Sequence, residues 1–214
     1  MTLFASVLQL DRKAVKELRI TDAYSLHRVV YSLYENVRDT ADKACSTPSG
    51  ILYADQGGDH RGRRILMLAD RMPASTVEGQ YGNVQSKLIP DSFLQHIHYR
   101  FRVIVNPTRR DSASRKLIPV RSRDSISDWF SQRAEQSWGF HPVAEQLQVD
   151  RVEVLQFTDK QKRSVTIAQA HVQGMLSVLD PLQFQNSFVR GIGRARSYGC
   201  GLLQIVPVIE NPFT

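Results

Sequence analysis

The sequence has few of the features that several classes of protein require. It contains two cysteines, Cys45 and Cys200, and no CxxC pair, so we expect neither a disulfide framework nor a structural zinc site. No apolar run approaches the roughly 20 residues that span a bilayer. No basic residues precede the first apolar stretch, so we expect no signal peptide. These absences predict a protein of the reducing cytoplasm that has no membrane partner.

The 214 residues have the composition of a globular protein. Hydrophobic residues make up 42% of the chain and charged residues 23%, which excludes disorder of the whole chain. The length fits two domains of about 100 residues each.

Positive charge is concentrated in the second half of the chain. The net charge is +7, and residues 97–214 carry 16 basic and 10 acidic side chains. Arginine outnumbers lysine 21 to 7, and its planar guanidinium suits bidentate contacts with phosphate. This balance indicates a nucleic-acid partner. Charge alone is equally compatible with a basic protein that binds no nucleic acid.

Hydrophobic periodicity predicts an alternating order of strands and helices in the first half. A helix begins after the N-cap Asp22 and ends near Ala44, and its apolar positions follow helical spacing. A further short stretch after Met72 is irregular or helical. The predicted strands cover residues 3–10, 51–54, 64–69 and 81–89.

The second half repeats this order. Residues 97–106 alternate, which places Ile97, Tyr99, Phe101, Val103 and Val105 on one face of a strand. The predicted helices cover residues 125–136 and 181–189, and the remaining strands cover 149–157, 165–178 and 202–206. A basic hairpin lies at 160–163, and a glycine-punctuated loop at 191–201.

Two successive β-α-β-β-α-β units predict an α+β protein with two tandem ferredoxin-like folds. We place the first domain at residues 1–95 and the second at residues 96–214. Because such folds support many functions, the function has to be inferred from particular residues.

The glycine-punctuated loop is a candidate phosphate-binding element. It is not a dinucleotide-binding GxGxxG loop, because a helix precedes it and a strand follows it. Gly193 allows close approach of the backbone to a phosphate, and Arg194 and Arg196 add charge. The alternative is a tight turn from helix to strand with arginines on its surface.

The first long helix carries a second candidate site. At about 100° per residue, His27 lies at the edge of the stripe formed by Leu26, Val30, Leu33 and Val37. Tyr24 lies three residues before His27, so the two side chains can touch. The alternative is a partly exposed histidine that has no catalytic role. The other five histidines, at positions 60, 96, 98, 141 and 171, are interpreted as structural or surface groups.

Several of these segments together resemble a known family. They are the Tyr24–His27 helix, the strand motif FRVIVNP at residues 101–107, the helix of Trp129 and, most specifically, the loop GIGRARSYGCGLL at residues 191–203. The chain is similar nearly end to end to the CRISPR-associated repeat-RNA endonucleases of the Cas-six family, in its CasE branch. The resemblance implies a tandem ferredoxin-like fold and cleavage of precursor CRISPR RNA within the repeat, without a metal or other cofactor. It implies the repeat RNA hairpin and effector-complex subunits as partners.

The candidate residues suit this chemistry. The 2′-hydroxyl of RNA is a built-in nucleophile, and histidine exchanges protons near neutral pH. We therefore assign the main proton transfer to His27, and expect Tyr24 to donate a hydrogen bond to the reacting groups. RNA contacts are expected from Arg28, Arg100, Arg102, Arg109, Arg110, Lys160, Lys162, Arg163, Gly193, Arg194 and Arg196.

Three hypotheses follow for the function of the chain. The first is a metal-independent endoribonuclease that acts on a CRISPR repeat hairpin. The second is a non-catalytic RNA-binding subunit of the same family. The third is a basic ribosome- or nucleoid-associated protein. Tyr24 and His27 together favour the first over the second, and the glycine-punctuated loop argues against the third.

Overall fold

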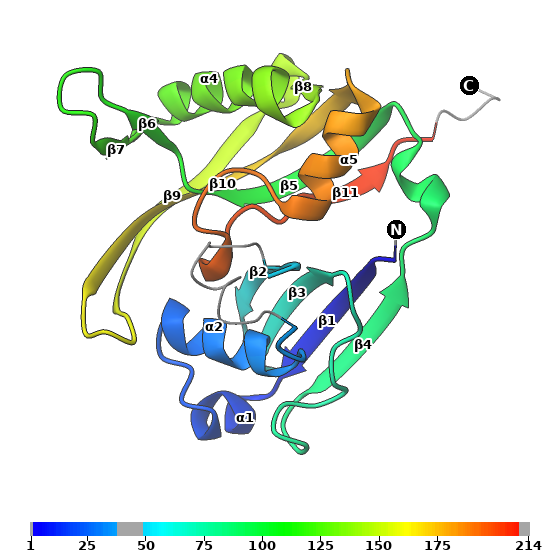
Figure 1. Ribbon diagram of the computed structural model, residues 1–214, viewed down its shortest axis with the longest axis vertical. Coiled ribbons are helices and arrows are strands. Elements are labelled where there is room, and N and C mark those ends of the chain that lie inside the picture. The colour runs from blue at the N-terminus through cyan, green and yellow to red at the C-terminus, as the bar shows by residue number, and fades with distance from the viewer. Residues whose placement is uncertain (1, 38–48, 210–214) are drawn as a thin grey trace.

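The computed structural model describes residues 2–37 and 49–209, in which two larger antiparallel sheets with associated helices are accompanied by one small two-stranded sheet (Figure 1). The predicted α+β class and the tandem ferredoxin-like fold are confirmed. The division into domains at residues 95 and 96 stays a prediction.

The first sheet has the strand order β2-β3-β1-β4. Its elements are β1 (Phe4–Leu10), α1 (Arg12–Glu17), α2 (Ala23–Ser32), β2 (Ile51–Gly58), β3 (Arg63–Ala69) and β4 (Asn83–Leu88). The four predicted strands are present. Between β3 and β4 the chain is irregular, with one isolated bridge between Val77 and Tyr81.

Two predictions for the helices of this half were wrong. Helix α1 was not predicted; its N-cap is Asp11, whose side chain accepts a hydrogen bond from the Ala14 backbone N–H. Helix α2 ends at Ser32 rather than near Ala44, and residues 38–48 lie outside the described residues. Val37 is therefore not on the helix, and its side chain is 63% exposed instead of continuing the apolar stripe.

The second half repeats the strand order of the first. Its strands are β5 (His98–Val105), β6 (Thr108–Arg110), β7 (Leu117–Pro119), β8 (Phe140–Pro142), β9 (Gln148–Thr158), β10 (Ser164–Val178) and β11 (Gln204–Pro207). Strand β5 lies between β11 and β10, and β9 pairs with β10, just as β1 lies between β4 and β3 and β2 pairs with β3. The pair β6–β7 and the short β8 were not predicted.

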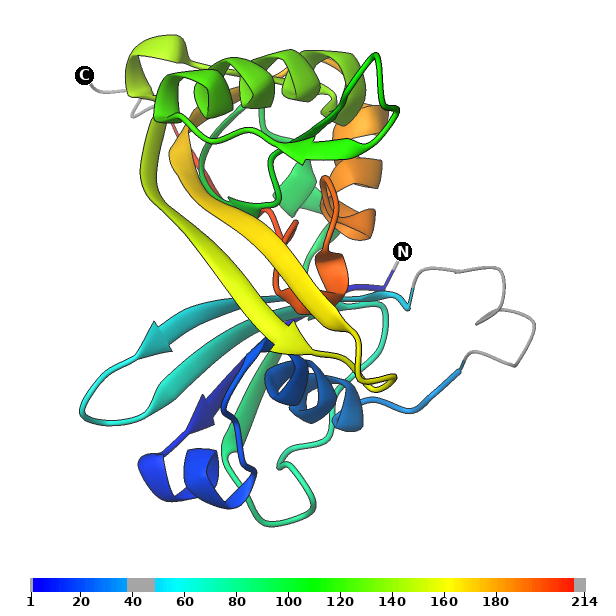
Figure 2. The same ribbon diagram turned by 90° about the vertical axis from the view of Figure 1, so that its left-hand side faces the viewer.

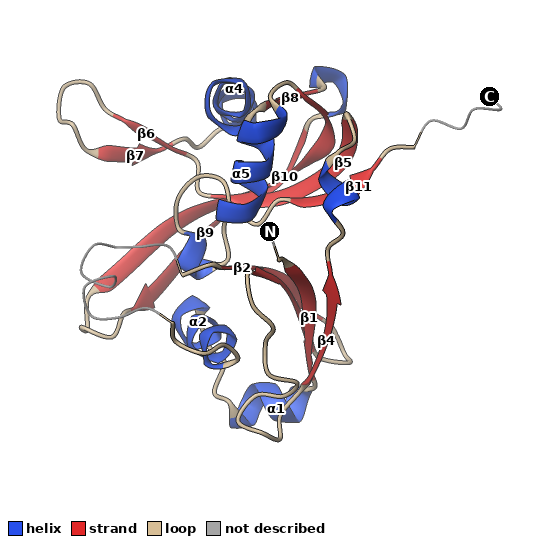
Figure 3. Cartoon of the chain, turned by 45° about the vertical axis from the view of Figure 1, so that its right-hand side comes forward, coloured by secondary structure: helices blue, strands red, loops and turns tan. Residues whose placement is uncertain are grey.

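The helices of this half are α4 (Arg123–Arg133) and α5 (Pro181–Arg190), with short helical turns η2 (Ala134–Trp138), η3 (Ala144–Gln146) and η4 (Arg196–Tyr198). One further turn, η1 (Asp91–Leu94), lies between β4 and β5. Both predicted helices are present. Figure 3 shows α4 and α5 on the side of the second sheet away from the first. The alternation predicted for β5 holds for Tyr99, Phe101, Val103 and Val105, which are buried, but Ile97 is 65% exposed because the strand begins one residue later.

The two faces of the first sheet have different neighbours. Tyr53 and Met67 belong to the core beneath α2. Leu52 and Leu68, one residue along each strand, belong to the core of the second half. Because successive side chains of a strand point to opposite faces, the first sheet lies between α2 and the second half. This arrangement brings α2 close to the loop that precedes β11.

Candidate functional site at the junction of the two halves

A capping box sets the start of α2. The Asp22 side chain accepts a hydrogen bond from the Ser25 backbone N–H at 2.7 Å, and the Ser25 hydroxyl accepts one from the Asp22 backbone N–H at 2.9 Å. This reciprocal pair satisfies two backbone donors that a helix start otherwise leaves unpaired. Leu26, Val29 and Val30 then face the core. The phase of the helix leaves His27 half-buried at the edge of that face.

His27 contacts the second half of the chain through a hydrogen bond. Its Nδ1 lies 2.8 Å from the backbone carbonyl oxygen of Ser197, which belongs to η4. A carbonyl oxygen accepts hydrogen bonds and donates none, so Nδ1 carries the proton. In the neutral ring, Nε2 is then the nitrogen without a proton.

Three tyrosine rings surround His27. The distances between ring centroids are 4.1 Å to Tyr31, 5.7 Å to Tyr198 and 6.3 Å to Tyr24. Burial raises the pKa of Tyr198 above its ordinary value, so its phenol stays a hydrogen-bond donor at neutral pH. Tyr198 was missed as a site residue, although it lies within the loop identified by its glycines.

The loop between α5 and β11 folds back on itself. The Ile192 backbone N–H donates to the Gly201 carbonyl at 2.9 Å, and the Gly201 N–H donates to the Ile104 carbonyl at 2.7 Å. Gly201 has a φ of +84°, and a Cβ there would lie 2.4 Å from the Ile192 oxygen, so only glycine fits. The tight turn from helix to strand, which was the alternative interpretation of this loop, is therefore present. The same loop also carries the Ser197 carbonyl, which accepts the hydrogen bond from His27.

The loop residues predicted to bind phosphate differ in their surroundings. Gly193 has a φ of +70° and open space around it. Arg194 is exposed. Arg196 donates from Nη1 to the Arg190 carbonyl at 2.6 Å, so its guanidinium helps to close the turn.

The basic hairpin between β9 and β10 reaches toward α2 (Figure 2). Asp159 organises its tip by accepting hydrogen bonds from the Gln161 and Arg163 backbone N–H groups, at 2.8 and 3.0 Å, and from the Arg163 guanidinium. The hydrogen bonds from Arg163 hold the pKa of Asp159 below its ordinary value. Lys160 and Lys162 are exposed. The tip thus presents two lysines beside an arginine that is paired with Asp159.

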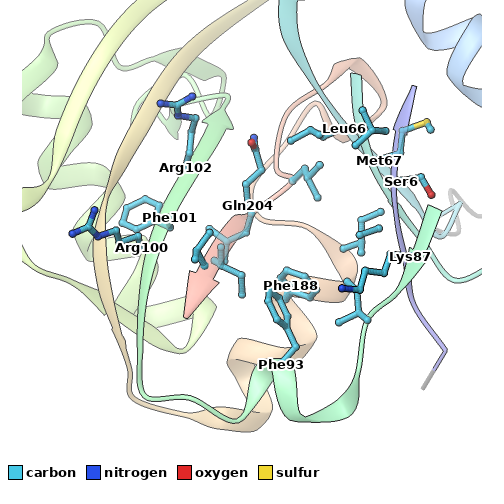
Figure 4. Close-up of a pocket in the computed structure, with 18 of the residues that line it drawn as sticks. Ser6, Leu66, Met67, Lys87, Phe93, Arg100, Phe101, Arg102, Phe188 and Gln204 are labelled. Carbon is cyan, nitrogen blue, oxygen red and sulfur yellow. The ribbon is translucent and has the colours of Figure 1, made fainter. Parts of the chain in front are cut away.

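The remaining predicted cations lie on three other surfaces. Arg28 is exposed on α2, and Arg109 and Arg110 are exposed on β6. Arg100 and Arg102 lie on β5, along a cleft of about 850 Å³ between the two sheets (Figure 4). Arg102 donates to the Gln173 side chain at 3.0 Å. The glycine-punctuated loop thus lies beside His27. Strand β6, with its two arginines, lies away from α2 in both Figures 1 and 2.

Three of the other histidines have polar side-chain partners. His98 bonds Ser177, His141 bonds Glu135 and His171 bonds Glu153. Within residues 2–37 and 49–209, no group of three or more His, Cys, Asp or Glu side chains is arranged to hold a metal ion. No helix in the described part of the chain is long and apolar enough to cross a membrane.

These features define a class of protein that has two ferredoxin-like units and a cluster of histidine and tyrosine side chains at their junction. A family model described as "CRISPR associated protein" matches residues 3–207, and the chain belongs to that family. The chain is 21% identical over 201 residues to the CRISPR system Cascade subunit CasE of Escherichia coli, covering 87% of this chain and 93% of the relative. It is 27% identical over 117 residues to the CRISPR-associated endoribonuclease Cse3 of Thermus thermophilus, covering 50% and 55%.

The fold is similar to that of solved members. A structure of the CRISPR endoribonuclease Cse3 bound to a 19-nucleotide RNA superimposes with a TM-score of 0.80 at 19% identity, covering 97% of this chain and 100% of that one.

The packing of the loop between α5 and β11 predicts how the Cys200 thiol reacts. This thiol is buried, and burial raises its pKa to about 12. In a Cys45→Ser variant at about pH 8, a thiol reagent should leave the folded protein unmodified and should react with one thiol per chain after unfolding, because the thiolate is the reactive form. Reaction of the folded protein as fast as a free cysteine would contradict the docking of the loop.

Proposed function

We propose that this protein is an endoribonuclease that cuts precursor CRISPR RNA within the repeat hairpin and so produces guide RNA. One observation carries the proposal: His27, held through Nδ1 by the Ser197 carbonyl, keeps Nε2 as its proton-accepting nitrogen. The names of the relatives support it, since one is an endoribonuclease and another a Cascade subunit. RNA and other effector-complex subunits are the proposed partners, and the cytoplasm is the proposed location.

The proposed reaction needs no metal ion. His27 Nε2 accepts the proton of the RNA 2′-hydroxyl as the 2′-oxygen bonds to phosphorus. The bond from phosphorus to the 5′-oxygen then breaks, and that oxygen takes a proton from the histidine or from water. The products are a 2′,3′-cyclic phosphate and a free 5′-hydroxyl. Tyr24 donates a hydrogen bond to the phosphorane oxygens as their charge develops.

RNA binding is assigned to cations around this site. Lys160, Lys162 and Arg163 at the hairpin tip, Arg28 on α2 and Arg194 of the loop are exposed, and are proposed to contact phosphates. Arg100, Arg102, Arg109 and Arg110 are proposed to extend this surface. Double-stranded RNA is recognised largely through its phosphates and shape, which suits a surface of arginine and lysine.

A non-catalytic RNA-binding subunit is the second candidate function. The exposed cations are compatible with binding alone. The ordered contact of His27 with Ser197 favours catalysis, since a histidine that only packed against the surface would have no need of a fixed tautomer. Membership of the CRISPR-associated family argues against a basic ribosomal or nucleoid protein.

Removing the imidazole should separate binding from cleavage. His27→Ala should bind repeat RNA with near-native affinity, and its single-turnover cleavage should be slower by about 10²- to 10⁴-fold because the proton acceptor is absent. His60→Ala, at an exposed position between β2 and β3, is the matched control and should cleave at the native rate. A His27→Ala protein that cleaves at the native rate would remove His27 from the mechanism.

Tyr24→Phe in the same assay distinguishes the roles of the two side chains. It keeps the ring and removes one donor, so its rate loss should be smaller than that of His27→Ala. A larger loss would reverse the two assignments.

The nucleophile is tested on the RNA itself. A repeat RNA with one 2′-deoxy nucleotide at the cut site should bind but stay intact, whereas the unmodified RNA should be cut in excess EDTA and end in a 2′,3′-cyclic phosphate. Cleavage of the deoxy RNA would contradict the proposed nucleophile. Loss of cleavage in EDTA that magnesium restores would contradict the metal-independent reaction.

The hairpin tip is tested by the salt dependence of binding. Each phosphate that a cation neutralises releases counterions, so Lys160→Ala/Lys162→Ala should weaken binding and reduce the salt slope by roughly one unit for each lysine–phosphate interaction removed. Lys13→Ala/Lys16→Ala on α1 removes the same charge from exposed positions on a helix that α2 separates from the hairpin tip (Figures 1 and 2), and should leave the slope unchanged. Equal slopes for all three proteins would show that the tip does not contact RNA.

A further inference from the structure

The Ser197 carbonyl accepts a second hydrogen bond besides that of His27. The phenol of Tyr53, on β2, donates to the same oxygen at 2.9 Å, while His27 Nδ1 lies at 2.8 Å. A carbonyl oxygen has two lone pairs, and here each has a donor from the first half of the chain. The same oxygen therefore links α2, β2 and η4.

Tyr53 is suited to hold this carbonyl in one orientation. Its side chain is 1% exposed, and burial raises its pKa well above the ordinary value. The phenol is therefore a permanent donor at working pH. The Tyr53 ring also lies against Gly199, where an added Cβ would approach it to 3.3 Å, so ring and loop are closely packed.

The neighbouring residues restrict η4 from the other side. The buried Gln169 donates from Nε2 to the Tyr198 carbonyl at 3.2 Å, and the Tyr198 ring packs on Phe157 with a centroid distance of 4.7 Å. Tyr198, the residue that follows Ser197, is thus held by the second half through its ring and its own carbonyl, and the Ser197 oxygen is held by the first half. Its direction toward His27 depends on both sets of interactions.

We propose that Tyr53 is a positioning residue, which orients the Ser197 carbonyl so that the His27 proton stays on Nδ1 and Nε2 remains the proton acceptor. Free histidine favours the opposite tautomer, with the proton on Nε2. Without this carbonyl, the ring would more often present a proton donor to the 2′-hydroxyl. The effect on cleavage rests on the proposed function, whereas the effect on the tautomer does not.

The experiment compares Tyr53→Phe with Tyr34→Phe. Tyr34 is a buried tyrosine of the same core whose hydroxyl has no hydrogen-bond partner among the described residues, so its variant controls for the removal of a buried hydroxyl. The ¹⁵N chemical shifts of the His27 ring, measured on RNA-free protein at a pH where the ring is neutral, report the tautomer. His27→Ala identifies the signals.

In the wild type and in Tyr34→Phe, His27 should show protonated Nδ1 and unprotonated Nε2. Tyr53→Phe should show a mixture of tautomers. It should also cleave about 10-fold more slowly in single turnover, with unchanged RNA affinity. A loss of this size is typical when a histidine that binds a metal in other proteins loses the group that orients its ring.

Two results would overturn the inference: a wild-type ring protonated on Nε2, or a Tyr53→Phe ring that keeps the wild-type tautomer. Equal shifts in Tyr34→Phe and Tyr53→Phe would also overturn it, since the effect would then belong to core packing. A wild-type protein that shows the expected tautomer but cleaves no repeat RNA would contradict the proposed function and leave the positioning role intact.

Discussion

The hydrogen bond from His27 Nδ1 to the Ser197 carbonyl is the interaction on which the site depends. It joins a helix near the start of the chain to a loop near its end. The capping box of α2 sets the phase of the helix, and the folded-back loop sets the position of the carbonyl. If either element moved, the imidazole would lose its fixed orientation. The tyrosine rings around it complete a site to which neither half contributes all the groups.

The packing of the two halves supports this hydrogen bond. Leu52 and Leu68, on one face of the first sheet, are part of the same core as the strands and helices of the second half. Burial of a leucine side chain contributes about 1.5–3 kcal/mol, more than the roughly 0.5–1.5 kcal/mol of a typical hydrogen bond. Apolar contacts therefore hold the halves together, and the hydrogen bond selects the geometry at their junction.

Local patterns were sufficient to predict much of the fold. Alternation identified β5, and the N-cap Asp22 identified the start of α2, because both signals arise between residues close in sequence. The end of α2 was placed too late because Val37 continues an apolar spacing beyond the last helical turn. The short strands β6, β7 and β8 were not predicted, because three residues are too few to show the alternation of apolar and polar side chains.

The site was predictable only in part. The helix pattern indicated His27 and Tyr24 as candidates, and the glycines indicated the loop; the structure places His27 beside both Tyr24 and the loop. The contribution of Tyr53 was not predicted, because its position in the sequence is that of a buried strand residue. Only the structure shows that its phenol donates to the Ser197 carbonyl, 144 positions away. Tyr198 was missed for the same reason, since its ring meets His27 only after the halves pack. Contacts over such separations leave no periodic signal in a single sequence.

The distance along the chain between His27 and Ser197 has a consequence for biosynthesis. A ribosome makes proteins from the N-terminus, so the imidazole is synthesised 170 residues before the carbonyl that orients it. Throughout most of translation, the nascent chain holds the histidine without its acceptor. The oriented site therefore forms only after the loop that carries Ser197 has been synthesised, and a chain terminated before residue 197 would contain His27 without the carbonyl that fixes its ring.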